Sequence, residues 1–165
     1  MAKIQLFSLV FNILIPASVL QDVFPEEEAK FNPLDRFRFE NVDFSLADAV
    51  ESDVIFKYYS DAYQINPRIL TIGSVSGHMD KEAKTVYMIH GYTQDDTDPW
   101  FRPLKRELFI QRQFNIVYIN WVKAGNKSYD VSSANINPVG KFIADFIVAS
   151  EVPPGLIHII GKYPI

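Results

Sequence analysis

The stretch from Lys84 to Tyr92, KTVYMIHGY, decides the fold class. Its part from Thr85 to Gly91 is almost continuously apolar and follows a loop at 73–84 that is rich in glycine, serine and charge. A strand with one solvent-exposed face alternates apolar and polar residues, whereas a strand covered on both faces forms an apolar run. The stretch therefore predicts a central strand of a largely parallel sheet.

A helix and a second strand are expected directly after this stretch. Asp98 and Pro99 are a helix-start signal, because the carboxylate can accept free N–H groups and proline has the φ of the first helical position. Apolar residues then recur at helical spacing to about Arg112. The mostly apolar run from Phe114 to Trp121 predicts the second parallel strand.

A second helix and a third strand continue the pattern. The helix is indicated by a period of 3.6 residues through Ile136, Val139, Ile143, Phe146 and Ile147. Pro138 leaves two alternatives for its start: Asn137 caps a helix that begins at Pro138, or the helix begins near Ser133 and kinks. Residues 153–155 end the helix, and Leu156 to Gly161 is predicted as a third buried strand.

Two short β-rich runs precede the central stretch, at 54–60 and 69–74. An Asn-Pro pair between them suits a turn, so we expect an antiparallel pair at the start of the sheet. Residues 21–52 show no sustained period, which indicates an irregular acidic and aromatic leader that partly packs on the domain. The domain is expected over 53–165, and its fold class is α/β, a mostly parallel sheet with flanking helices.

Composition narrows the class of protein. The chain has 165 residues, 48% of them hydrophobic and 22% charged, which is ordinary for a globular domain with one core. Its formal net charge of −4 provides no broad basic field for a phosphate backbone. A nucleic-acid partner is therefore not expected.

The amino terminus has the pattern of a secretory signal. Lys3 supplies a positive start, and residues 4–20 form an apolar run that is short for a bilayer span. We expect residues 1–20 to be a signal peptide and the protein to be secreted and extracellular; an uncleaved anchor helix or a buried core helix are the alternatives. The chain contains no cysteine, so packing has to replace disulfides. The single sequon, Asn126-Lys127-Ser128, makes Asn126 a candidate glycosylation site on that route.

Chemistry is expected where the parallel strands end. Ligands of an open parallel sheet gather outside the carboxyl ends of its strands, and both His90-Gly91-Tyr92 and Gly161 lie at such ends. Glycine at 91 permits a close backbone approach or a positive φ, which a site needs when it offers main-chain N–H groups to a developing oxyanion. The alternative is that Gly91 only turns the chain.

No metal or cofactor site is expected. His78, His90 and His158 show no metal-ligand spacing, and cysteine is absent. His158 lies within an apolar run and is interpreted as a hydrogen-bonded interior residue.

Four segments together resemble the successive motifs of the pancreatic-lipase family. They are, in this order and at similar spacing, KTVYMIHGY (84–92), FNIVYINW (114–121), YDVSSANINPVGKFIADF (129–146) and IHIIG (157–161). The family includes triacylglycerol lipases, lipoprotein lipases, phospholipases A1 of insects and venoms, and yolk proteins. The resemblance covers roughly residues 54–161 and implies the amino-terminal part of an α/β-hydrolase fold.

The resemblance also implies roles for single residues. The backbone N–H of Tyr92 would be one oxyanion-hole donor, and His90 and Gly91 would support its loop, with His90 not acting as a base. Trp100, Phe101 and Trp121 could touch lipid in such a family, but their periodicity explains them as core or cover.

The family continues its third strand with Gly-His-Ser-Leu-Gly, an elbow that exposes the serine nucleophile and supplies a second oxyanion donor. Here the sequence is Gly161-Lys162-Tyr163-Pro164. Tyr163 stands at the serine position, and Pro164 has no N–H to donate. We therefore expect a lipase domain truncated at the nucleophile elbow, without catalytic residues of the triad and inactive as given.

The expected function is that of a secreted lipase-family protein. The family hydrolyses lipid carboxylic esters, triacylglycerol or phospholipid, by a Ser-Asp-His triad, and the partner implied is a lipid or a lipid–water interface. A non-catalytic lipid-binding or yolk-storage-like protein is the alternative. A short secreted isoform that binds another protein is a third hypothesis.

Overall fold

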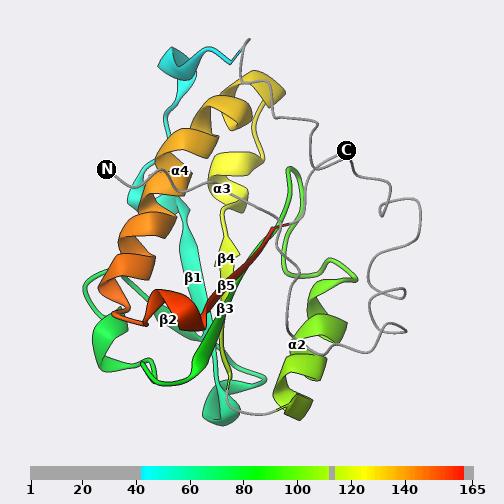
Figure 1. Cartoon of the computed structure of the whole chain (residues 1–165). Helices are drawn as coiled ribbons and strands as arrows, with labels where there is room; N and C mark the ends of the chain where they lie inside the picture. The colour runs from blue at the N-terminus through cyan, green and yellow to red at the C-terminus, as the bar shows by residue number, and fades with distance from the viewer. Residues whose placement is uncertain (1–41, 112–113, 162–165) are drawn as a thin grey trace.

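The structure, a computed structural model, describes residues 42–111 and 114–161 (Figure 1). Its strands are β1 (Ile55–Tyr59), β2 (Arg68–Leu70), β3 (Lys84–Ile89), β4 (Phe114–Asn120) and β5 (Ile157–Gly161). Its helices are α2 (Phe101–Gln111), α3 (Val122–Gly125) and α4 (Tyr129–Ala149). Short 3-10 helices are η3 (Phe44–Leu46), η4 (Glu51–Asp53), η5 (Asp61–Tyr63), η6 (Val75–Gly77) and η7 (Pro154–Leu156).

The strands form one sheet in the order β2-β1-β4-β3-β5. β3 runs parallel to both of its neighbours, β4 and β5, so the apolar stretch is an interior strand as predicted. β1 pairs antiparallel with β2, which confirms the predicted early pair, and also antiparallel with β4. The predicted third strand forms as β5, but the expectation that it is buried is wrong: it lies at the edge of this sheet, with a described strand on one side only, and none of its five residues is fully buried. The α/β class is confirmed.

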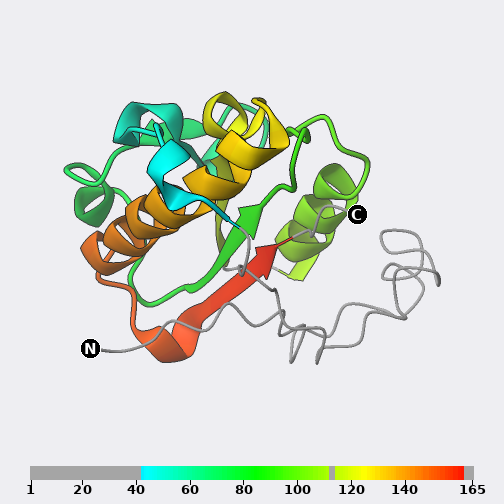
Figure 2. The same ribbon diagram turned by 90° about the horizontal axis from the view of Figure 1, so that it is seen from above.

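Side chains alternate across the sheet, and each face has its own helical cover (Figures 1 and 2). On the face of α4, Tyr87 packs near Phe146, which stacks on Phe56 with 3.9 Å between ring centroids. On the opposite face, Val86 packs in a separate cluster that contains Leu108 of α2. Because helices cover both faces, the interior strands are apolar runs without alternation.

Two predicted boundaries are wrong by a few residues. β2 ends at Leu70 and not at residue 74, because Ser74 closes a turn: its N–H donates to the Thr71 carbonyl oxygen at 3.0 Å. α2 begins at Phe101 and not at Pro99. The Phe101 N–H donates to the Asp98 carbonyl oxygen at 3.2 Å, so a separate turn precedes the helix.

The second helix is longer than either predicted alternative. α4 begins at Tyr129 and continues through Pro138. Proline inside a helix costs about 3 kcal/mol, since it loses the bond to the carbonyl four residues back. Burial of Ala134 and Val139 on both sides of it offsets this cost. The first turns gave no apolar signal because they bury polar residues, Asn135 above all.

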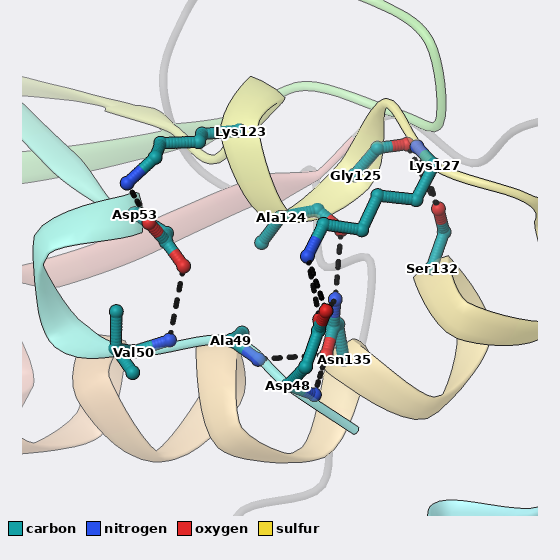
Figure 3. A network of polar contacts seen from close by, with 10 residues as sticks. All are labelled: Asp48, Ala49, Val50, Asp53, Lys123, Ala124, Gly125, Lys127, Ser132 and Asn135. Carbon is teal, nitrogen blue, oxygen red and sulfur yellow. Dashed lines mark hydrogen bonds and ion pairs between the residues drawn. The ribbon is translucent and has the colours of Figure 1, made fainter. Parts of the chain in front are cut away.

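Asn135 fastens the segment before β1 to the helical layer (Figure 3). Its Oδ1 accepts the backbone N–H groups of Asp48 at 2.8 Å and Ala49 at 3.0 Å. Its Nδ2 donates to the Ala124 carbonyl oxygen and to the Asp48 carboxylate, each at 3.0 Å. The Asn135 side chain is fully buried, so these contacts replace the hydrogen bonds that water would make.

Two lysines reinforce this attachment (Figure 3). Lys127 Nζ lies 2.6 Å and 2.7 Å from the two carboxylate oxygens of Asp48, and Lys123 forms an ion pair with the buried Asp53. Hydrogen bonds from these lysines lower the pKa values of Asp48 and Asp53. Residues 48–53 are thereby held against α3 and α4.

The predicted signal peptide at 1–20, the predicted leader up to residue 41, and residues 162–165 lie outside the described residues. Among residues 42–111 and 114–161, no helix has the length and apolar character needed to cross a bilayer. The candidate glycosylation residue, Asn126, is described and exposed.

Replacing Asn135 by alanine tests whether this residue holds the segment before β1 against the helices. Asn135→Ala leaves the N–H groups of Asp48 and Ala49 without their acceptor, and we expect the free energy of unfolding to fall by about 2–4 kcal/mol. Asn137→Ala is the matched control, because Asn137 is exposed on the same helix. Urea unfolding followed by circular dichroism measures both, and an equal effect of the two substitutions would contradict the role of Asn135.

Candidate functional site

The two predicted strand ends lie side by side at the carboxyl edge of the sheet. β3 and β5 are parallel, and Ile89 lies opposite Gly161 in their register. Ile89 also lies opposite Ile119 of β4, so Trp121 follows at the same edge. Three parallel strands therefore bring the His90 loop, Trp121 and Gly161 to the place where sites of such sheets form.

His90 joins the ends of β3 and β4. Its Nε2 accepts the backbone N–H of Trp121 at 3.0 Å, and its carbonyl oxygen accepts the Trp121 indole N–H at 2.7 Å. Its Nδ1 lies 2.8 Å from the carbonyl oxygen of Gly91. The histidine is 2% exposed and stacks on the indole, with 5.6 Å between ring centroids. Both ring nitrogens are thus occupied by the protein itself.

These contacts require an uncharged imidazole. Nε2 accepts an N–H only when it carries no proton, so the single ring proton is on Nδ1 and is donated to Gly91. Burial lowers the pKa of His90 below its ordinary value of 6.5. The bond to Gly91 and the carboxylates of Asp98, Asp95 and Asp96 act in the opposite direction and are weaker. At neutral pH, His90 therefore holds the loop as a neutral side chain.

The loop after His90 contains an unbonded backbone donor. The Gly91 N–H donates to Gln94 Oε1 at 3.0 Å, and the Gln94 N–H donates to the Gly91 carbonyl oxygen at 3.2 Å, which closes a turn. The Tyr92 N–H makes no hydrogen bond within residues 42–111 and 114–161. Its phenol is fixed, because the hydroxyl donates to the Lys127 carbonyl oxygen at 3.1 Å. One free N–H is therefore held on an anchored loop at the sheet edge.

Backbone strain in this loop falls on Thr93 and not on Gly91. Thr93 has φ 58°, whereas no described glycine has a positive φ. Of the two features that glycine at 91 permits, the positive φ is not used, and Gly91 lies buried in the turn closed by Gln94. A β-branched residue in the left-handed region costs on the order of 1–3 kcal/mol, and such residues cluster at functional sites.

Unsatisfied polar atoms gather near the same loop. Within the described part of the chain, Asp98 Oδ2, Trp100 Nε1 and Tyr118 Oη are buried without a hydrogen-bond partner. Burial raises the pKa of the Tyr118 phenol well above its usual value. Native protein interiors leave few such atoms without a hydrogen bond. The strained Thr93 and these unpaired groups together make the loop between β3 and α2 a candidate functional site.

The other histidines contribute nothing to this edge. His78 is exposed, and its Nδ1 accepts a hydrogen bond from the Arg68 guanidinium at 2.7 Å. His158 is half-buried on β5 and its side chain makes no hydrogen bond among the described residues, so these residues do not support its interpretation as a hydrogen-bonded interior residue. In the same part of the chain, no group of three histidines or carboxylates is placed to hold a metal ion.

The hydrogen-bond partners of the His90 loop were not predicted from the sequence. Trp100, Phe101 and Trp121 are buried, as their periodicity predicts. Periodicity could not show that Trp121 also exchanges two hydrogen bonds with His90. A signal was present: His90 and Trp121 each follow directly after one of two adjacent parallel strands.

The lowered pKa of His90 predicts a pH dependence of stability. Between the lower pKa of the folded state and 6.5 in the unfolded chain, the unfolded chain binds more protons, so stability falls as pH falls below about 6.5. The slope reaches at most about 1.4 kcal/mol per pH unit. His90→Gln removes this component.

Urea midpoints of both proteins at pH 7.5 and pH 5.5 test this prediction. We expect the wild type to lose more stability between the two values than the His90→Gln variant does. Equal losses would contradict a neutral, buried His90.

Comparison with known proteins agrees with this geometry. Residues 47–164 match the protein-family model named Lipase. The pancreatic triacylglycerol lipase of Cavia porcellus is 28% identical over 116 residues, which are 66% of this chain and 25% of that protein. The protein of the same name from Sus scrofa is 27% identical over 118 residues, 66% of this chain and 26% of that protein.

A third relative is the inactive pancreatic lipase-related protein 1 of Homo sapiens, 25% identical over 114 residues, which are 64% of this chain and 24% of that protein. The chain spans about a quarter of the length of these curated relatives. The family model covers well over half of the chain, and the mixed sheet with flanking helices is consistent with a partial α/β-hydrolase fold. The chain thus belongs to the pancreatic-lipase family and matches its amino-terminal portion.

Proposed function

We propose that this chain supplies the oxyanion-binding part of an ester hydrolase site. During ester hydrolysis the carbonyl oxygen gains negative charge, and fixed backbone N–H groups stabilise that charge. One observation carries the proposal: the Tyr92 N–H is unbonded among the described residues, at the carboxyl edge that also contains Gly161. The neutral His90, bonded to Trp121, holds its loop in place.

The substrate class that we propose is a lipid carboxylic ester, with either triacylglycerol or phospholipid as its source. Relatives named pancreatic triacylglycerol lipase support this class. We further propose secretion, which the positive start at Lys3 and the apolar run at 4–20 support. A lipid–water interface is the partner that follows from this substrate class.

The 165-residue chain is proposed to be inactive by itself. Tyr163 occupies the position at which the family has its serine, and a phenol is a useful nucleophile only when a neighbouring group activates it. Pro164 occupies the position of the second oxyanion donor and has no N–H. In a serine protease, loss of the serine alone lowers kcat by about 10⁶-fold, about as much as loss of the whole triad.

These two residues also favour a second candidate function. A protein that keeps the fold but has tyrosine and proline in place of serine and the second donor could bind lipid without hydrolysing it. Binding of the chain to a triolein emulsion, together with no release of fatty acid, supports this candidate.

A segment graft tests the oxyanion donor in an active protein. Residues 84–92 of this chain replace the matching segment of the Cavia porcellus pancreatic triacylglycerol lipase, and hydrolysis of p-nitrophenyl butyrate is measured. We expect the graft to retain turnover. Tyr92→Pro in the graft removes the N–H and should lower kcat by about 10²–10³-fold.

Tyr92→Phe in the same graft is the matched control, because it keeps the backbone N–H and removes only the phenol hydroxyl. Circular dichroism establishes that each variant is folded. Equal kcat for the proline and phenylalanine variants would contradict the role of Tyr92. In the same assay we expect no turnover by the 165-residue chain; turnover that Tyr163→Phe abolishes would overturn its proposed inactivity.

A further inference from the structure

The connection between α3 and α4 consists of the three residues of the sequon. α3 ends at Gly125 and α4 begins at Tyr129, so Asn126, Lys127 and Ser128 form the whole connection. The sequon therefore occupies a defined turn at the surface.

The three side chains of this turn have different surroundings. Asn126 and Ser128 are exposed, and neither side chain makes a hydrogen bond within the part of the chain that the structure describes. Lys127 is half-buried and points to Asp48 (Figure 3). Its backbone N–H donates to Ser132 Oγ at 3.3 Å. The middle residue anchors the turn, and the two residues that define a sequon face the solvent.

Asn126 itself terminates a helix without using its side chain. Its backbone N–H donates to the Val122 carbonyl oxygen at 2.7 Å, and its φ and ψ of −98° and 54° lead the chain out of α3. The carboxamide is free of this capping bond. A large substituent on Nδ2 would displace no contact that holds the fold.

We propose that Asn126 carries an N-linked glycan. The inference rests on the secretion included in the proposed function, since the reaction takes place on the secretory route. The Asn126 Nδ2 attacks the anomeric carbon of a lipid-linked oligosaccharide diphosphate. A nitrogen–carbon bond forms, the bond from that carbon to the diphosphate oxygen breaks, the lipid diphosphate leaves, and one amide proton is lost to solvent.

The glycan would stand beside the candidate site. The Lys127 carbonyl oxygen accepts the hydrogen bond of the Tyr92 hydroxyl, so Asn126 is the residue next to an anchor of the oxyanion loop. α3 itself follows the carboxyl end of β4. A hydrated oligosaccharide at Asn126 would keep this side of the sheet edge in water. Lipid would therefore have to approach the Tyr92 loop from another side.

Translation of the full chain in the presence of microsomes tests the proposal. Protection from added protease reports entry into the secretory route, and a gel shift reversed by an endoglycosidase reports glycosylation. We expect protection and a shift of one glycan. Asn126→Gln and Ser128→Ala should abolish the shift, whereas Ser128→Thr, which keeps the sequon, and Asn137→Gln, which lies outside it, should retain it.

The experiment distinguishes failure of the glycan at Asn126 from failure of the proposed secretion. A protected chain without a shift overturns the glycan at Asn126 and leaves secretion standing. An unprotected chain overturns secretion. In that case a cleavable heterologous signal fused before residue 21 directs the same variants into microsomes, and the presence or absence of the Asn126-dependent shift decides whether this asparagine is an acceptor.

Discussion

The hydrogen bonds between His90 and Trp121 fix how two parallel strands end. One residue follows β3 and the other follows β4, and each uses both a backbone and a side-chain group in the exchange. The bond from the Trp121 backbone N–H to Nε2 holds only while the imidazole is neutral, and burial keeps the imidazole neutral at physiological pH. The candidate site therefore depends on an uncharged histidine that needs no substrate to set its orientation. Gly91, Tyr92 and the strained Thr93 follow this fixed point directly.

Apolar packing and buried polar contacts stabilise different features of this chain. Apolar contacts on both faces of the sheet supply its core, in a protein without cysteine. Buried polar groups then set positions that apolar contacts leave free: Asn135 holds the segment before β1, and His90 holds the loop after β3. Lys127 contacts both regions, through its ammonium group to Asp48 and through its carbonyl oxygen to Tyr92. The leader segment and the site loop thus share one anchor.

Much of the fold follows from the sequence, because the runs at 85–91 and 114–121 have the apolar character of strands covered on both faces. The run at 156–161 also forms a strand, but this strand lies partly exposed at the edge of the sheet. The start of α4 does not follow, because its first turns bury polar side chains. Asn135 finds its partners 11 and 87 residues away in the chain, and no local pattern shows such pairs. The site was predicted only in part. Family motifs indicated Tyr92, but the left-handed Thr93 and the bonds of His90 depend on tertiary contacts.

Amide hydrogen exchange at pH 7, resolved residue by residue by NMR, tests whether His90 fixes the strand ends and leaves the Tyr92 N–H unbonded. The Trp121 N–H is bonded to the buried His90 Nε2, and the Tyr92 N–H two residues after His90 has no partner among the described residues. We expect slow exchange at Trp121 and fast exchange at Tyr92 in the same sample. Slow exchange at Tyr92, or fast exchange at Trp121, would contradict a neutral His90 that locks the strand ends and leaves an oxyanion donor free.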